Sequence, residues 1–244
     1  MQSVTKRNYS ICFALHICVI MIGIPQSCSS QFGIGGRFTM IQDGYWHEVF
    51  ALRNAEYSDQ LASISGLYWF RLKKKRVEFL PEIGYYNSIN NNVGTGPPNN
   101  MRAFFLQFNT DIYFLDFGSD CNCPTFSKES DFFKRGLFLE ISPGVELGKL
   151  GIDYIEDTQL AIREFKHRVL KLYAGLGFDI GLSDLVTVTA IAGFSFLQGT
   201  AWDGVEEFLE VDAGSLDQTK RNQDVAMNAG VRILLRPDYI RKRR

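Results

Sequence analysis

The chain has 244 residues, of which 45% are hydrophobic and 22% are charged, and its formal net charge at pH 7 is -1. A net charge this close to zero argues against a basic protein that binds the phosphate backbone of nucleic acids. The longest apolar run falls short of the roughly 18 residues that a membrane-spanning helix needs, which argues against a helical membrane protein.

The beginning of the chain has the order of a secretory signal peptide. Two basic residues precede an apolar stretch over residues 11–24, and small residues follow it up to Ser30. We therefore expect residues 1–30 to be cleaved on export, so that the mature protein begins near Gln31. The alternatives are an uncleaved N-terminal anchor and a lipid attached at Cys28, although the residues before that cysteine fit a lipoprotein signal poorly.

The cysteines agree with export. Of the five cysteines, only Cys121 and Cys123 remain once the signal segment is removed. A pair at this spacing is a local turn staple, a pair of free thiols or half of a metal site, and no histidine or further cysteine lies nearby in the sequence to complete four ligands. We therefore predict no metal and no cofactor.

Eight segments of the mature chain alternate between apolar residues and polar or small residues, which is the pattern of half-buried strands. The clearest runs from Leu170 to Leu182, where every even position is apolar and the odd positions include glycine, lysine and aspartate. Ser183 and Asp184 join it to the next segment as a tight hairpin. In chain order we predict strands over residues 32–41, 61–72, 76–87, 102–116, 136–147, 170–182, 186–196 and 223–235.

The strand lengths and connections indicate an all-β fold, a transmembrane antiparallel up-and-down β-barrel of about eight strands. Segments of roughly 10 to 12 residues, each rising about 3.3 Å and tilted by about 40°, cover the apolar thickness of an outer membrane. Long connections alternate with short ones, as external loops alternate with periplasmic turns in such barrels. The long ones are residues 42–60, 88–101, 148–167 and 198–222, and the short ones are 73–75 and 183–184. The segment 118–135 breaks this alternation, because it is long but lies on the short-turn side.

Alternation alone leaves open whether the apolar face points outward to lipid or inward to a ligand, as in a soluble lipocalin-like barrel. The polar face is rich in glycine and carries isolated charges of both signs, which suits a crowded lumen where small residues make room for long ones. Eight strands leave an interior just wide enough for its own side chains, so we expect these charges to pair and close the lumen. The predicted lumen residues are Arg37, Arg71, Glu78, Glu82, Asp111, Glu140, Glu146, Lys171, Asp179 and Arg232.

Aromatic residues fall near several predicted strand ends, where transmembrane barrels carry aromatic girdles at the two membrane interfaces. The residues concerned are Tyr68, Trp69, Tyr85, Tyr86, Tyr113 and Phe117.

The last predicted strand contains Asn228, followed by Gly230 and then by the apolar residues Ile233 and Leu235. Residues 31–236 resemble the small outer-membrane β-barrels of Gram-negative bacteria, such as the transmembrane domain of outer membrane protein A. The last strand is the most specific part of this resemblance. The resemblance implies an outer-membrane location, contact with outer-membrane lipids, and recognition of these four residues by the barrel-assembly machinery. The chain departs from the family because a basic tail, residues 237–244, follows where an aromatic residue usually ends the strand; we expect this tail on the periplasmic side.

The sequence carries no catalytic motif that would make the protein an enzyme. His47 and His167 both fall in predicted loops, and neither has a serine at a patterned spacing. We therefore predict a non-enzymatic barrel with a structural or interaction role, acting through acidic external loops toward a ligand that the sequence does not identify. The acidic residues of the last loop are Asp203, Glu206, Glu207, Glu210, Asp212 and Asp217. The alternatives are a lipid-modifying barrel enzyme and a narrow channel.

Overall fold

The computed structural model of the chain describes residues 31–42, 44–55, 57, 59–71, 77–89, 99–114, 136–156, 159–182, 186–211, 216 and 220–235. The predicted signal segment 1–30, the predicted tail 237–244, and the cysteine pair Cys121 and Cys123 lie outside the described residues.

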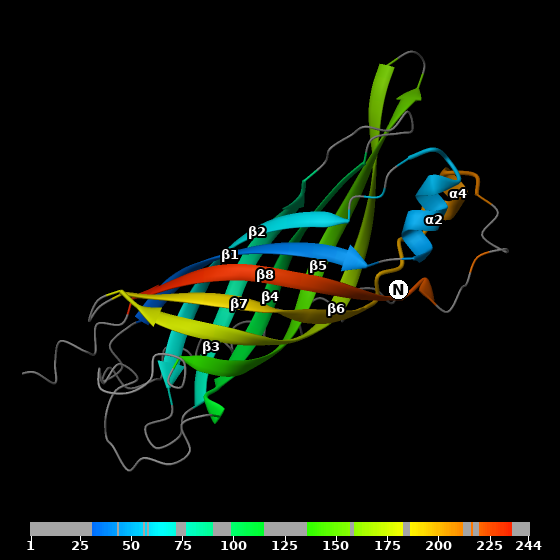
Figure 1. The fold of residues 1–244 in the computed structure, drawn as a ribbon. Helices are drawn as coiled ribbons and strands as arrows, with labels where there is room; N and C mark the ends of the chain where they lie inside the picture. Colours follow the sequence, from blue (N-terminus) through cyan, green and yellow to red (C-terminus); the bar gives the residue numbers. More distant parts are fainter. Residues whose placement is uncertain are drawn as a thin grey trace, which may run out of the picture. The chain divides into compact units, whose positions relative to one another are not determined.

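Eight strands form a closed ring in which each strand pairs antiparallel with the next, and the last strand closes on the first (Figure 1). The strands are β1 (Gln31–Gln42), β2 (Gln60–Arg71), β3 (Val77–Ser88), β4 (Asn99–Ile112), β5 (Leu137–Glu156), β6 (Gln159–Gly181), β7 (Val186–Gln198) and β8 (Gln223–Leu235). This confirms the predicted eight-stranded up-and-down barrel. Because the ring is closed, every strand has a partner on both sides along the barrel wall.

Two short helices, α2 (Tyr45–Ala51) and α4 (Val205–Phe208), interrupt the β1–β2 and β7–β8 connections. Figure 1 shows them side by side at the long-loop end of the barrel, and hydrogen bonds from Tyr45 to Glu206 and from Arg53 to the carbonyl of Leu209 join them. Neither helix was predicted from the sequence. Within the described residues, no helix has the length and apolar character needed to cross a membrane.

The outward rows of the wall carry large apolar side chains that are exposed at the protein surface. Ile64 is 69% exposed, Phe104 is 65% exposed and Leu170 is 60% exposed, whereas charged residues on the inward rows are buried. A soluble barrel would bury these apolar side chains around a ligand, so the lipocalin-like alternative is wrong. We call the exposed apolar rows the apolar belt. All eight strands contribute to it, through Ile34, Ile64, Ile83, Phe104, Leu147, Leu170, Leu176, Phe196 and Ile233.

The β5–β6 hairpin is longer than predicted. Residues 148–167 were expected to form a loop, but pairing continues from Leu137 and Phe178 to Glu156 and Gln159. Alternation persists over this segment with the opposite polarity, because apolar side chains such as Phe165 now point inward and charged ones point outward. The sequence analysis looked for strands whose apolar residues face outward, so it missed the strands in this segment. The predicted strand over residues 102–116 is shifted toward the N-terminus and spans Asn99–Ile112.

Glycines on the inner face make room for larger side chains from neighbouring strands. A Cβ added at Gly177 would collide with the ring of Phe138, and one added at Gly148 would collide with the imidazole of His167. Each of these glycines is the direct cross-strand partner of the residue that it accommodates. The close approach of side chains from the neighbouring strand therefore requires glycine at these two positions.

We expect Leu176→Arg to lower the free energy of unfolding by about 2–4 kcal/mol, because it places a charge in the lipid-facing part of a strand. Leu182→Arg is the matched control, since Leu182 is equally apolar and 66% exposed but follows the end of β6. Its cost should be about 0–1 kcal/mol, as for charges near the membrane interface. Urea unfolding in phospholipid vesicles measures both values, and equal effects would contradict the assignment of the apolar belt to lipid.

Candidate functional site

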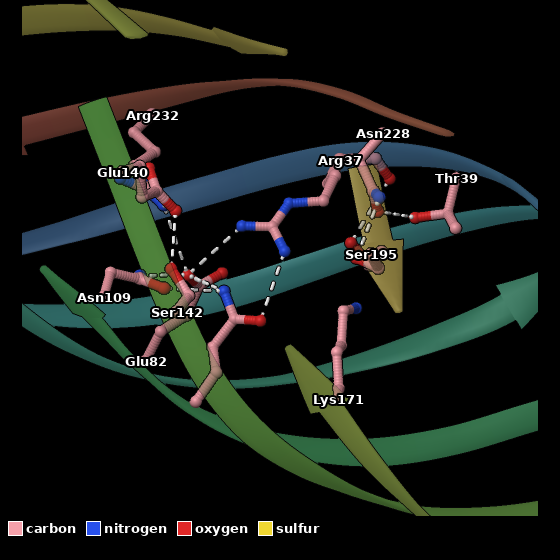
Figure 2. Close-up of polar contacts among 12 residues, drawn as sticks. Arg37, Thr39, Glu82, Asn109, Glu140, Ser142, Lys171, Ser195, Asn228 and Arg232 are labelled. Carbon is pink, nitrogen blue, oxygen red and sulfur yellow. Dashed lines mark hydrogen bonds and ion pairs between the residues drawn. The ribbon is translucent and has the colours of Figure 1, made fainter. Parts of the chain in front are cut away.

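Glu82 on β3 lies at the centre of a layer of polar side chains that fills the lumen (Figure 2). Its Oε2 accepts hydrogen bonds from Gln107 Nε2 at 2.7 Å and from Asn109 Nδ2 at 2.6 Å. Arg37 on β1 lies 3.5 Å from the same carboxylate oxygen and donates a hydrogen bond to Gln107 Oε1 at 3.2 Å. These contacts join β1 to β3 and β4, which are not its neighbours in the ring.

Arg232 on β8 joins the same layer to a second group of carboxylates. Its Nη2 donates to Glu140 Oε1 at 2.6 Å and lies 3.7 Å from Glu82 Oε2. Its Nη1 lies 3.7 Å from Asp111 Oδ2. Ser142 donates a further hydrogen bond to Glu140 Oε1 at 2.9 Å. Arg232 is 1% exposed, so these carboxylates supply the opposite charge that a buried guanidinium needs.

Toward the long-loop end, a buried ion pair adds to the polar layer. Lys171 Nζ lies 2.9 Å from Glu146 Oε1, and the hydroxyl of Tyr86 donates to Glu146 Oε2 at 3.2 Å. On the neighbouring wall, Asn228 accepts a hydrogen bond from Thr39 Oγ1 at 2.9 Å and donates one to Ser195 Oγ at the same distance (Figure 2).

Toward the short-turn end, a chain of hydrogen bonds runs between two acidic residues. The indole of Trp69 and the hydroxyl of Tyr113 both donate to Glu78 Oε2. Tyr113 also lies 2.7 Å from Asp179 Oδ2, and Thr189 donates to the other oxygen of Asp179. With this group, side chains from all eight strands contribute to the polar lumen.

Above the polar lumen, the described residues at the long-loop end form a cap, consisting of residues 44–55 and 200–211 with Arg221. Trp46 and Trp202 of the cap are fully buried against apolar residues of the upper barrel. Glu206 binds Arg221 at 2.7 Å and accepts a hydrogen bond from the hydroxyl of Tyr45, which ties α4 to α2. The barrel residues beneath the cap include Ile41, Leu61, Met101, Leu150, Ile152, Phe165 and Val169.

Little free space is left between the cap and the polar lumen. The cavity bounded by Glu146, Lys171, His167 and Trp202 has a volume of about 20 Å³, enough for about one water molecule. The described lumen is therefore occupied by side chains both in its polar part and beneath the cap.

No protein-family model matches the sequence, and no curated protein matches it. Neisserial surface protein A (NspA) has a similar fold, with 11% identity and a TM-score of 0.44, covering 84% of this chain and 97% of that chain. Ail, the attachment invasion locus protein of Yersinia pestis, has 8% identity and a TM-score of 0.44 over 84% and 97% of the two chains.

A major outer membrane protein from Thermus thermophilus has 9% identity and a TM-score of 0.43, covering 85% of this chain and 100% of that chain. The class of the present chain is decided by its own closed strand ladder and by the apolar belt that surrounds a polar, buried lumen. The protein is an outer-membrane β-barrel.

The barrel places nine of the predicted lumen residues on its inner face and buries them. They are Arg37, Glu78, Glu82, Asp111, Glu140, Glu146, Lys171, Asp179 and Arg232. Arg71 lies at the end of β2, and its side chain lies outside the described structure. Most of the predicted residues make direct contacts with one another.

Sequence reasoning missed the neutral members of the lumen, Gln107 and Asn109, although both share the inward phase of Asp111 on β4. It also assigned Trp69, Tyr86 and Tyr113 to aromatic girdles. All three point inward and donate hydrogen bonds to lumen carboxylates, so this assignment was wrong. Their phase along the strands, which matches that of the charged residues, was the signal that could have identified them as lumen residues.

The predicted assembly signal lies on the strand that closes the barrel. Asn228 is buried in the lumen, and Gly230 lies against the backbone of β1. Ile233 and Leu235 face outward and are 41% and 48% exposed. Recognition of these residues by the assembly machinery stays a prediction.

The described residues bring no serine, histidine and carboxylate together. Ser142 and Ser195 are bound to Glu140 and Asn228, as small lumen residues. His167 lies in β6, not in a loop as predicted, and its ring centroid is 3.6 Å from that of Trp202. His47 is exposed on α2. No group of three potential metal ligands occurs in the part of the chain that the structure describes.

We expect Arg232→Gln to lower the free energy of unfolding by about 3–5 kcal/mol, because it leaves several buried carboxylates without their cation. Arg163→Gln is the control, since it removes the same charge from an exposed position on β6, and its effect should stay within about 0.5 kcal/mol. Urea unfolding in neutral detergent micelles measures the difference. A small loss for Arg232→Gln would show that the lumen carboxylates do not depend on this guanidinium.

The cap should loosen in acid. Burial works against ionisation of Glu206, but hydrogen bonds from Arg221 and Tyr45 outweigh it and hold the pKa of Glu206 below its ordinary value of 4.5. A lowered pKa in the folded state means that the carboxylate stabilises the cap at neutral pH, and that this stabilisation is lost as the pH falls below 4.5.

Acrylamide quenching of tryptophan fluorescence tests the cap, because the indole rings of its Trp46 and Trp202 are fully buried. Quenching of the wild type should increase in acid, whereas Glu206→Gln should already be more quenched at neutral pH and respond less to acid. Glu207→Gln, an exposed neighbour on α4, is the matched control and should behave as the wild type. Identical curves for both variants would contradict a role for the Glu206–Arg221 pair.

Proposed function

We propose that the protein is a non-transporting, non-enzymatic outer-membrane barrel with a structural or interaction role, carried by the cap at its long-loop end. The observation that carries this proposal is the occupation of the lumen in two layers. Paired charges around Glu82 and Arg232 fill the barrel, and the apolar side chains of the cap close its upper part. A barrel filled in this way offers its outer and loop surfaces to partners, and not a passage.

The cap also carries an acidic surface. The side chain of Asp203 is 93% exposed and that of Glu210 is 84% exposed, and Glu207 is exposed beside them on α4. Glu206, predicted as part of the same acidic surface, is instead engaged with Arg221 inside the cap. The predicted acidic residues Asp212 and Asp217 lie outside the described residues. The proposed surface for a partner therefore consists of Asp203, Glu207 and Glu210.

The contacts in the lumen support the part of this proposal that assigns no enzymatic activity to the barrel. Ser142 and Ser195 are hydrogen-bonded to lumen partners, and the ring of His167 packs against Trp202 at an interplanar angle of 42°. A nucleophile would need a base within hydrogen-bonding reach and a space for the substrate. The described lumen offers a cavity of about 20 Å³, which is too small for a lipid substrate.

Planar bilayer recording tests the closed lumen. Wild-type barrel should give no sustained current, because the paired side chains leave no continuous water path, and a porin inserted into the same bilayer serves as the positive control. Unboiled and boiled samples should migrate differently on a denaturing gel, which verifies that the recorded protein is a folded barrel. Stable large currents from folded protein would contradict the proposal and would indicate a transport function.

A further inference from the structure

A groove of about 1460 Å³ runs along the outer wall of β3 to β6 at the long-loop end. Tyr85, Phe104 and Leu147 contribute its apolar side and are cross-strand neighbours on a single rung of the ladder. Phe104 is 65% exposed and Leu147 is 56% exposed. This side of the groove therefore belongs to the edge of the apolar belt.

The other side of the groove is cationic. Arg102, Lys149 and Lys166 are cross-strand neighbours on the next rung toward the loops, and Arg168 is paired with Leu147 on the apolar rung. Because side chains alternate along a strand, all four cations point to the outside of the barrel. The register of three strands thus places a row of positive charge directly beside apolar side chains.

Only part of this charge is neutralised. Glu164 binds Arg102 and lies 2.9 Å from Lys149 Nζ. Lys166 and Arg168 make no ion pair with any residue that the structure describes. At the far end of the groove, Asp203 lies 3.8 Å from Arg221, which offsets its charge. The groove therefore retains an excess of positive charge.

The position of the groove favours the phosphate of a lipid over a free anion. The cationic row begins where the apolar belt ends, which is the boundary between hydrocarbon and headgroups for a barrel in a membrane. A phosphorylated lipid places its phosphate at that depth and its acyl chains alongside Phe104 and Leu147. A free anion in water gains nothing from the apolar side of the groove.

We propose that this groove, which we call the cationic groove, binds the phosphorylated headgroup of a lipid in the leaflet on the long-loop side. Lys166 and Arg168 contact the phosphate, Arg102 and Lys149 border it, and the first carbons of an acyl chain lie on Phe104 and Leu147. The proposal concerns the outer wall and does not depend on the function proposed for the cap.

Native mass spectrometry of the barrel in neutral detergent, titrated with phosphatidic acid, tests this proposal. Each basic residue near a lipid headgroup is worth about five-fold in affinity, so Lys166→Gln with Arg168→Gln should weaken binding by about 30-fold. The exchange Lys166→Arg with Arg168→Lys keeps both charges and should bind as the wild type. Heat-modifiable gel mobility verifies that each variant is folded.

The matched control is Arg53→Gln with Arg163→Gln, which removes the same charge from exposed positions that do not line the groove. This variant should bind phosphatidic acid as the wild type does. Phosphatidylcholine, in which a choline cation neutralises the charge of the phosphate, should bind all variants equally and weakly. Equal loss in both double variants would overturn the proposal, because binding would then follow net charge and not the groove. Displacement of the lipid by an equal concentration of inorganic phosphate would also overturn it, because the site would then recognise a free anion.

Discussion

The packing of charged side chains inside the barrel depends on the buried guanidinium of Arg232. A small closed barrel has to fill its own lumen, and the inward rows of this one bring carboxylates from several strands close together. Without a cation among them, these groups would repel one another in a site that water does not reach. Arg232 reaches Glu140, Glu82 and Asp111 from the closing strand, so closure of the ring and neutralisation of the lumen occur together.

The remaining lumen contacts follow from this arrangement. Arg37 approaches Glu82 from the other side and lies 5.2 Å from the ring centroid of Tyr173, so it is held by both an ion pair and an aromatic face. The amides of Gln107 and Asn109 donate hydrogen bonds to the same carboxylate oxygen of Glu82 that the two arginines approach. Polar residues give way to apolar ones higher in the barrel, where the cap supplies tryptophan and phenylalanine side chains to bury.

The strand positions and their facing were predictable from sequence because alternation has only two phases, and residues such as Leu176 and Asp179 make the phase unambiguous. The upper β5–β6 hairpin was not predictable in the same way. Outside the membrane, outward residues such as Lys166 are charged, and inward residues such as Phe165 are apolar because they meet the cap, so the rule that holds within the membrane reverses. The helices of the cap were missed because α2 and α4 are too short to show a helical period.

The pairing of lumen charges was beyond sequence analysis for a different reason. The predicted list contained both signs, but which cation meets which carboxylate depends on the register between strands. Arg232 and Glu140 are 92 positions apart in the sequence and lie on strands that are not neighbours in the ring. Only the closed ladder brings them together across the lumen.

The long β5–β6 hairpin also affects the solubility of the folded protein outside the membrane. The pairing of β6 with β7 ends at Leu170 and Gln198, so the part of β6 nearer the loops leaves the ring on that side. A strand edge of this kind is a template on which the backbone of another chain can add. Glu164, Lys166 and Arg168 place a charged side chain at every second position of this stretch, and these charges would lose part of their hydration if another chain paired with the edge. The same side chains therefore protect the barrel against self-association through its longest strand.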